Sequence, residues 1–227
     1  MAIEKVDIAQ AATRLSEPFH MAHLGYVDDF SVSVFICQGK IEWHRHIDED
    51  ELFLVHSGII TLESAWGNTR LRPDEMAVVP KGVAHRSSSV LRSTVLLFQP
   101  SVMSHRKNGD RRTTAPPEGK SLHKVSVAKA AQKLTEPFQP VDLLTVEDCV
   151  MRLALIQGPF PWHLHRSHDE LFLVFEGRMT LGTEQGNVPL TAGEMAIVPQ
   201  GMLHRPAALA RTIVFLFEKK ALISTGD

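Results

Sequence analysis

The sequence has little cysteine, no long apolar run and almost balanced charges. Only two of its 227 residues are cysteine, Cys37 and Cys149. They do not occupy equivalent positions in the repeat described below, so we expect two isolated small hydrophobes rather than a disulfide or a cysteine-ligated metal. No apolar segment approaches the roughly 18 residues that a membrane-spanning helix needs. The formal charge of −2 provides no basic field for nucleic acid or an anionic membrane.

Several functional motifs are also missing. We find no Ser-His-Asp order, no phosphate-binding loop and no glycine pattern of a dinucleotide-binding fold. The N-terminal segment lacks the charged-then-apolar layout of a signal peptide, so we expect a cytoplasmic protein. Hydrophobic residues make up 44% and charged residues 22% of the chain, which is an ordinary globular composition. We therefore expect a small-molecule ligand or substrate, and neither nucleic acid nor membrane as a partner.

What the chain does contain is an internal repeat at a constant offset of 119 residues. Asp50–Val55 recurs as Asp169–Val174, with the same six residues in the same order. The offset holds from Lys5 to Phe98, so no net insertion separates the two copies. This regularity predicts two domains, at 1–105 and 122–227. A polar stretch containing proline and glycine, residues 106–121, is expected to link them.

Each copy is expected to be a β-barrel preceded by a short helix. The helices are predicted at Ile8–Leu15 and Val127–Leu134, with Asp7 and Ser126 as caps. Many short apolar or β-branched runs follow, separated by turn residues, which is typical of a small antiparallel barrel. The predicted strands are Phe30–Ile36, Leu52–Val55, Ile59–Leu62, Met76–Val79 and Thr94–Phe98 in the first copy, and Cys149–Ile156, Leu171–Phe175, Met179–Leu181, Met195–Val198 and Thr212–Phe217 in the second. Gly67-Asn68 and Gly186-Asn187 suit hairpin turns.

Three histidines and one glutamate recur in both copies. The eight candidate metal ligands are His44, His46, Glu51 and His85 in the first copy, and His163, His165, Glu170 and His204 in the second. Alternate residues of a strand point to one face, so the two histidines of each His-x-His would project into the barrel together. Three imidazoles and one carboxylate suit iron(II), manganese, nickel, cobalt or zinc. We therefore expect one divalent transition metal in each barrel.

With these motifs in place, the chain resembles the cupin superfamily, in the form of a two-domain bicupin. The first family motif reads Gly39, His44, His46, Glu51 and Gly58, and recurs as Gly158, His163, His165, Glu170 and Gly177. The second motif reads Gly193, Pro199, Gly201 and His204, whereas the first copy has Asp74 in place of the opening glycine. The resemblance implies an all-β fold of two tandem double-stranded β-helix (jelly-roll) barrels, with a metal at each barrel mouth and a possible homodimer. We expect the fold to tolerate Asp74, because aspartate adopts left-handed geometry more readily than most residues.

The reaction stays open at this level, because cupins carry out many reactions. Lewis-acid chemistry on a small oxygen-rich metabolite, as in an isomerase, epimerase or lyase, is the first hypothesis. An iron-dependent dioxygenase is the second, and a non-catalytic module that binds or senses a small molecule is the third.

Residues beside the ligands give weaker signals. Strand alternation predicts that Arg86 and Arg205, each directly after a last ligand, face outward, and that Trp43 and Trp162 pack outside the pocket. Asp50 and Asp169 are expected to order the bends before the glutamates. A further pair, Ser33 in the first copy and Arg152 in the second, differs in charge between the copies. An exposed arginine is the favoured interpretation at 152, while an inward-pointing side chain would make the two pockets differ.

Overall fold

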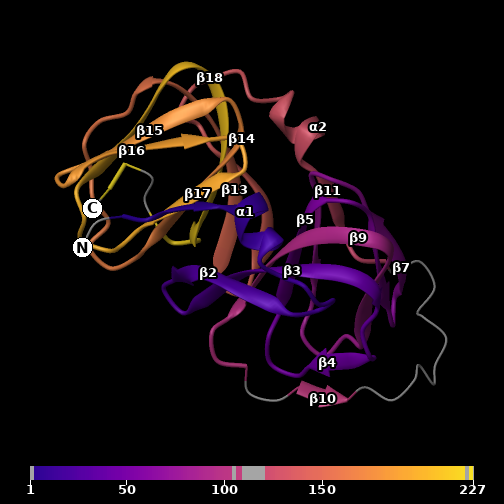
Figure 1. The fold of residues 1–227 in the computed structure, drawn as a ribbon. Coiled ribbons are helices and arrows are strands. Elements are labelled where there is room, and N and C mark those ends of the chain that lie inside the picture. Colours follow the sequence, from indigo (N-terminus) through magenta and orange to yellow (C-terminus); the bar gives the residue numbers. More distant parts are fainter. Residues whose placement is uncertain (1–2, 104–105, 109–120, 223–224, 227) are drawn as a thin grey trace. The chain divides into compact units, whose positions relative to one another are not determined.

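The computed structural model describes residues 3–103, 106–108, 121–222 and 225–226. These residues form two compact all-β units, one of residues 11–127 and the other of residues 1–10 together with 128–227 (Figure 1). Strands dominate both units, and each unit contains one antiparallel sheet network. The predicted all-β fold of two barrels is confirmed. No helix among these residues is long and apolar enough to cross a membrane.

The unit of residues 11–127 is built around the long strand β9. Its strands are β2 (Met21–Val27), β3 (Phe30–Lys40), β4 (His44–His46), β5 (Glu51–Ser57), β6 (Ile60–Ser64), β7 (Gly67–Leu71), β8 (Glu75–Val79), β9 (His85–Pro100), β10 (Arg106–Asn108) and β11 (Lys124–Ser126). We call this unit the N-terminal barrel.

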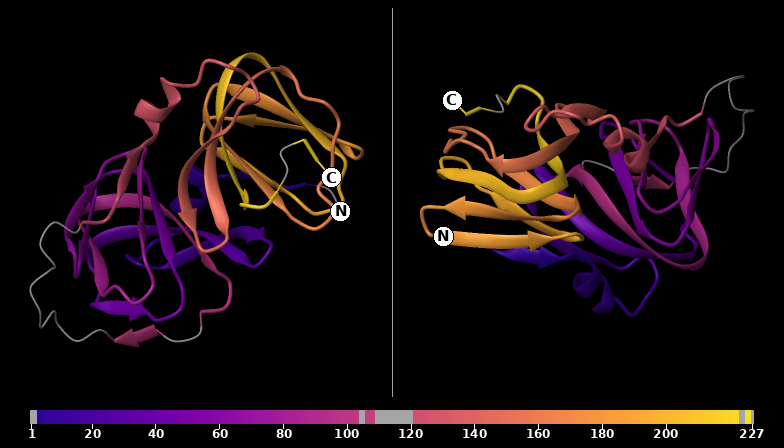
Figure 2. Two further views of the ribbon diagram at one scale, coloured as in Figure 1. Left: turned by 180° about the vertical axis from the view of Figure 1, so that it is seen from behind. Right: turned by 90° about the horizontal axis from the view of Figure 1, so that it is seen from above.

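The second unit repeats this plan around β18. Its strands are β1 (Lys5–Asp7), β12 (Val141–Val146), β13 (Cys149–Pro159), β14 (Glu170–Glu176), β15 (Arg178–Thr183), β16 (Gly186–Thr191), β17 (Glu194–Val198) and β18 (His204–Lys219). We call this unit the C-terminal barrel, and its orange and yellow strands can be followed from two further directions in Figure 2.

The long strand of each barrel changes partners along its length, and this positions the site. The first residues of β9 pair with β6, and His85 pairs with His44 of β4. The later residues of β9 pair with β3 on one side and β5 on the other. In the C-terminal barrel, the first residues of β18 pair with β15, and an isolated bridge joins His204 to His163. The last ligand of each set is thereby hydrogen-bonded, through its backbone, to the strand or segment that carries the first.

Alternating apolar side chains fill the inside of each barrel. In the N-terminal barrel they include Phe35, Phe53 and Leu97, and in the C-terminal barrel Phe172 and Leu216. Both cysteines are buried, and neither forms a disulfide among the described residues. Burial raises the pKa of the Cys37 thiol to about 11, so this thiol behaves as an apolar side chain at neutral pH.

The two short helices are α1 (Ile8–Thr13) and α2 (Val127–Ala131). Both begin where predicted, and Asp7 Oδ1 accepts a hydrogen bond from Gln10 N at 2.9 Å as the predicted cap of α1. Both end earlier than predicted, because the last turn tightens to i→i+3 hydrogen bonds, such as Leu15 N to Ala12 O and Leu134 N to Ala131 O.

Each barrel is completed by a short strand from near the start of the other half of the sequence. Strand β1 pairs with β17, so the indigo N-terminal strand lies against an orange one in Figure 1. Strand β11 pairs with β8 in the same register. Lysine–glutamate pairs accompany both strands, Lys5 with Glu194 at 2.8 Å and Lys124 with Glu75 at 3.0 Å. The expected linker, residues 106–121, falls largely outside the described residues.

The hairpin turns lie two residues before the predicted positions. Ser64 pairs with Gly67, so Ala65 and Trp66 form the two-residue turn, and Gly67 opens the returning strand. The second barrel has the same arrangement, with Thr183 opposite Gly186. A hydroxyl explains the shift, because Ser64 Oγ accepts from Trp66 N at 3.1 Å and donates to Gly67 O at 2.8 Å, which closes the turn without a glycine inside it.

Candidate metal centres

In the N-terminal barrel the structure brings the four predicted ligands together in one buried cluster. The ligand atoms of His44, His46, Glu51 and His85 all lie within 4.8 Å of one another. Glu51 Oε2 lies 2.8 Å from His85 Nε2 and 3.3 Å from His46 Nε2. The rings of His44 and His85 are 4.4 Å apart between centroids. The His-x-His strand, the start of β5 and the start of β9 thus converge on one point.

The C-terminal barrel repeats this geometry closely. Its four ligand atoms, from His163, His165, Glu170 and His204, also lie within 4.8 Å of one another. Glu170 Oε2 lies 3.1 Å from His204 Nε2 and 3.3 Å from His165 Nε2. The centroids of the His163 and His204 rings are 4.2 Å apart.

Backbone carbonyls select the nitrogen that the first and last histidines of each cluster present. The Nδ1 atoms of His44 and His85 lie 2.9 and 3.0 Å from the carbonyl oxygens of Glu42 and Val83. His163 and His204 make the same contacts with Pro161 and Met202, at 3.1 and 2.9 Å. Because a carbonyl can only accept, Nδ1 must carry the proton, which leaves the Nε2 lone pair directed into the cluster.

The electrostatics of both clusters favour the protonation states that a metal needs. Burial opposes ionisation of Glu51, but its contacts with His46 and His85 outweigh that effect, so its pKa lies well below the usual range. Glu170 has a lowered pKa for the same reasons, with His165 and His204 as its contacts. Burial lowers the pKa of His163 to about 4. Ionised glutamates and a neutral imidazole are therefore in place at neutral pH.

A turn before the last histidine of each cluster is hydrogen-bonded to the segment that carries the second histidine and the glutamate. Asp50 Oδ1 accepts from Lys81 N at 2.8 Å and Asp169 Oδ1 accepts from Gln200 N at 2.9 Å, so both aspartates bind this turn, while their expected role in ordering the bends before the glutamates stays a prediction. The next residue of each turn, Gly82 or Gly201, donates its N–H to the carbonyl of the second histidine at 2.6 Å. Both glycines have positive φ, 77° and 76°, a conformation that other residues rarely adopt. Asp74 also has a positive φ, 63°, as expected.

A small apolar cavity opens beside each cluster. In the C-terminal barrel it measures about 40 Å³, and the titratable residues lining it are the ligands His163 and Glu170. Its other walls are the apolar residues Phe138, Pro140, Ala154, Ile156, Phe160, Phe172, Pro206 and Leu216. The N-terminal cavity measures about 30 Å³, and four of its lining residues differ in type from their equivalents, since Met21, Phe35, Ile41 and Ser87 stand where Pro140, Ala154, Phe160 and Pro206 stand in the other barrel. Neither lining provides an acid or base beyond the ligands.

The arginines and tryptophans next to the ligands face away from the cavities. The Arg86 guanidinium stacks over Trp43, with the Arg86 Cζ 5.0 Å from the ring centroid, and pairs with Glu63 at 2.7 Å. Arg205 stacks over Trp162 at 4.9 Å, and Trp162 is 45% exposed. None of the four lines either cavity, so the outward orientation predicted from strand alternation is confirmed.

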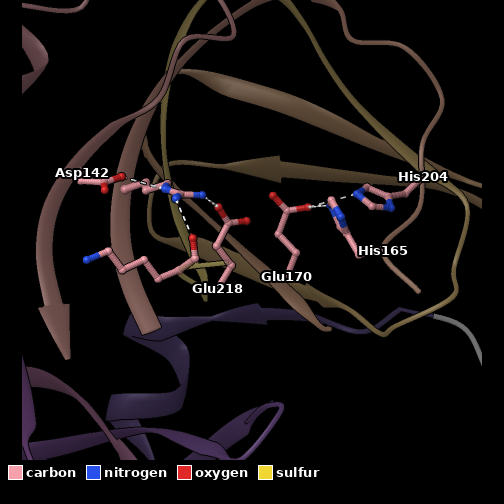
Figure 3. A network of polar contacts seen from close by, with 7 residues as sticks. Asp142, His165, Glu170, His204 and Glu218 are labelled. Carbon is pink, nitrogen blue, oxygen red and sulfur yellow. Dashed lines mark hydrogen bonds and ion pairs between the residues drawn. The ribbon is translucent and has the colours of Figure 1, made fainter. Parts of the chain in front are cut away.

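The favoured interpretation of Arg152 as an exposed residue is wrong, because its side chain is only 12% exposed. Its guanidinium donates to Asp142 Oδ1 at 2.8 Å and, on the other side, to Glu218 Oε1 (Figure 3). Glu218 is fully buried and lies beside the ligand Glu170, on the side away from His165 and His204. Burial raises the pKa of Glu218 to about 8, and the neighbouring Glu170 adds to the shift.

Sequence reasoning missed Glu218. The available signal was the pair of substitutions between copies, since Arg152 replaces Ser33 and Glu218 replaces Gln99 at the same offset. The two positions meet only because β13 and β18 are neighbouring strands, with Arg152 opposite Leu216. A charge change on one strand that is matched by an opposite charge change on its neighbour would have indicated the pair.

Both donor sets fit a divalent metal. Glu51 Oε2, His85 Nε2 and His165 Nε2 are buried and lack an aligned hydrogen-bond partner among the described residues. Buried polar atoms without partners are costly, and one cation in each cluster would satisfy them. Imidazole nitrogens and a carboxylate oxygen are borderline-to-hard donors that suit first-row transition metals.

Comparison with known proteins agrees with this picture. The family described as "Cupin domain" matches residues 34–91 and 150–217. The uncharacterised protein YdbB of Bacillus subtilis (strain 168) is 31% identical over 91 residues, which covers 40% of this chain and 80% of that protein.

Two solved structures share the fold over almost the whole chain. The salicylate 1,2-dioxygenase of Pseudaminobacter salicylatoxidans aligns with a TM-score of 0.80 at 10% identity, covering 96% of this chain and 84% of that one. A cupin 2 conserved barrel domain protein of Leptotrichia buccalis aligns with a TM-score of 0.69 at 11% identity, covering 96% and 97%. At such identities the likeness concerns the fold alone.

Proposed function

The chain belongs to the cupin family, with one cupin domain in each half, and from this premise we propose that it is a metal-dependent dioxygenase acting on a small, largely apolar molecule. The observation that carries the proposal is a set of three imidazoles and one carboxylate at the edge of a small cavity whose other walls are apolar. A metal in that set supplies Lewis acidity and, as iron(II), electrons for dioxygen.

The lining of the cavities favours oxygen chemistry over the isomerase and lyase alternatives. An isomerase or lyase acting on a sugar or hydroxy acid needs hydrogen-bonding groups for the hydroxyls and an acid or base to move a proton. The C-terminal cavity offers neither outside the ligands, and the aromatic side chains Phe138, Phe160 and Phe172 are among its apolar walls. A dioxygenase places both atoms of dioxygen in its substrate, so it requires no external reductant.

The cavity volumes limit the size of the substrate that fits without a movement of side chains. A volume of about 40 Å³ holds dioxygen or one or two waters, whereas a benzene-sized guest occupies an engineered cavity of about 150 Å³. An aromatic acid would therefore need Phe160 or a neighbouring side chain to move. The aromatic substrate named for the structurally similar salicylate dioxygenase supports a planar molecule as the first class to test.

The protein's own residues perform three tasks in this proposal. The backbone carbonyls behind His163 and His204 keep Nε2 unprotonated and directed at the metal. Glu170 provides the negative charge of the donor set, and the Phe-lined wall keeps bulk water away from the reacting atoms.

The test is oxygen consumption by the full-length protein loaded anaerobically with iron(II). We expect substrate-dependent oxygen uptake with at least one member of a panel of small aromatic and enolic acids that includes salicylate and gentisate. The same protein loaded with zinc is the control and should consume none.

Three outcomes would contradict the proposal. Failure of the iron-loaded protein to consume oxygen with any compound would refute the proposed dioxygenase activity. Turnover under argon with several divalent metals would instead support Lewis-acid chemistry. Saturable ligand binding without any product would support a sensing role.

A further inference from the structure

Glu218 has no role in the function proposed above. It lies outside the ligand set and does not line the cavity, yet it is fully buried within the C-terminal barrel. Burying a carboxyl group is costly unless a partner compensates for it, so its position calls for an explanation.

Arg152 holds Glu218 from one side. The arginine is fixed at both ends of its guanidinium, by Asp142 and by the Glu218 Oε1 atom, and a third contact reaches the carbonyl of Lys220 at 3.4 Å (Figure 3). The other oxygen, Glu218 Oε2, is buried and has no aligned hydrogen-bond partner among the described residues. Arg152 therefore holds one oxygen of the carboxyl group, and the second oxygen lies next to Glu170.

Two carboxyl groups in buried contact repel each other if both are ionised, and they attract if they share a proton. The unpartnered oxygen of Glu218 lies beside Glu170, on the side away from the histidines (Figure 3). One proton held between the two facing carboxyl groups would join them. Such a contact on the outer side of Glu170 would fix the plane of its carboxylate while Oε2 faces His165 and His204.

The N-terminal barrel has a different arrangement at the equivalent positions. Ser33 and Gln99 replace Arg152 and Glu218. Ser33 belongs instead to a neutral hydrogen-bonded chain, in which Ser31 Oγ lies 3.4 Å from Ser33 Oγ and 3.1 Å from His23 Nδ1. The charged network is therefore a property of one barrel, not of the shared fold.

We propose that Glu218, anchored by Arg152, is a positioning residue for the metal ligand Glu170, and that it makes the C-terminal site bind divalent metal more tightly than the N-terminal site. Partners that orient metal ligands typically change metal affinity by about 10–100-fold when they are removed. The inference rests on metal binding by the two donor sets and not on the oxygen chemistry proposed above.

The first measurement compares the two sites without altering Glu218. In the full chain, His44→Ala leaves the C-terminal site to be titrated alone, and His163→Ala leaves the N-terminal site. We expect cobalt(II) to bind the C-terminal site at least about tenfold more tightly. Equal affinities, or a tighter N-terminal site, would overturn the inference.

The second measurement tests the hydrogen bond itself, in the His44→Ala background. Glu218→Gln keeps a donor for Glu170 and an acceptor for Arg152, so we expect cobalt(II) affinity within about threefold of the parent and an unchanged visible cobalt spectrum. The double variant Arg152→Met/Glu218→Leu removes both charges together, which avoids leaving a buried unpaired guanidinium. It should bind about 10–100-fold more weakly, with an altered spectrum.

The matched control is Gln99→Leu in the His163→Ala background, which should leave cobalt(II) affinity unchanged. A double variant that binds as tightly as its parent would overturn the inference, and so would Glu218→Gln binding as weakly as the double variant. A parent that binds no cobalt would refute the metal site itself. Absence of oxygen uptake would refute only the dioxygenase.

Discussion

The two barrels hold the same four ligands in nearly the same geometry, but the residues around the ligands differ. Ring separations agree within a few tenths of an ångström, for example 5.3 Å for His44–His46 and 5.1 Å for His163–His165. The cavity wall, by contrast, has Ile41 in one barrel and Phe160 in the other.

This difference separates two kinds of constraint. Four donor atoms must meet within a few ångströms to bind one ion. The strand register and the turn before the last histidine, which position these atoms in each barrel, therefore allow little variation. The cavity wall and the surroundings of the glutamate have no such requirement. They determine what else can approach the metal and how firmly the glutamate is held, and these are the properties in which the two copies can acquire different functions.

Removing one ligand from either barrel should have the largest effect. His44→Ala and His163→Ala should each reduce bound metal from two ions per chain to one, because three remaining donors lower the affinity by at least about a hundredfold. Elemental analysis of the purified variants measures this directly. If both ions were lost in one variant, the sites would not be independent and the comparison between them would fail.

Replacing the glycine after β5 or the glycine after β14 by alanine should destabilise the barrel concerned, and the N-terminal barrel more. Gly58 has φ +80°, and a Cβ there would overlap Ser93 Oγ and lie 2.8 Å from the Ser93 Cα. At Gly177 the nearest contacts are longer, 2.7 Å to Thr212 Oγ1 and 3.0 Å to Arg211 O. We expect about 2–4 kcal/mol for Gly58→Ala and about 1–3 kcal/mol for Gly177→Ala, since strained backbone and overpacking add.

Chemical denaturation followed by circular dichroism compares the two glycine variants. Gly39→Ala is the matched control, because its φ is also positive, +82°, but a Cβ there would meet nothing within 4 Å. An equal loss of stability in all three variants would show that backbone strain alone decides the effect.

Much of the fold and all eight candidate ligands could be predicted from the sequence, because the repeat presents each motif twice. Strands with uniform apolar character, such as β5 and β14, were recognised within two residues of their ends. Strand β2 was missed, since its mixed residues, from the exposed Met21 to the buried Val27, show no clear alternation. The pairing of β1 with β17 was also missed, because no local pattern in three residues identifies a distant partner.

Arg152 shows the same limit at the site. Its residue type argued for exposure, and only the pairing of β13 with β18 places it next to Glu218. Sequence reasoning failed where contacts between strands that are distant in sequence, rather than residue preferences, determine the structure.

Loosening the turn that carries the last histidine should have a moderate effect in both barrels. Asp50→Ala and Asp169→Ala each remove a hydrogen bond from a carboxylate to a backbone N–H, at 2.8 and 2.9 Å. A hydrogen bond to a charged group contributes about 1.5–3 kcal/mol, so we expect a loss of stability near the lower limit and several-fold weaker metal binding in the altered barrel alone.

Asparagine provides the control for this pair, because Asp50→Asn and Asp169→Asn retain an acceptor oxygen and should recover most of the metal affinity. Metal titration in the single-site backgrounds measures the effect. Weaker binding in the unaltered barrel would show that the two turns are coupled and would contradict their independence.

The lysine–glutamate pairs that accompany β1 and β11 should matter least, and they test whether the barrels are also equivalent at their edges. Lys5 pairs with Glu194 and Lys124 with Glu75, with lysine side chains 41% and 35% exposed. Exposed ion pairs contribute about 0–1 kcal/mol and are weakened by salt. Lys5→Ala and Lys124→Ala should therefore each lower stability by less than about 1 kcal/mol, and the loss should shrink as salt is added. A larger loss that persists in high salt would indicate that the lysine stems, not their charges, hold these strands, so that the first residues of each half contribute through apolar packing.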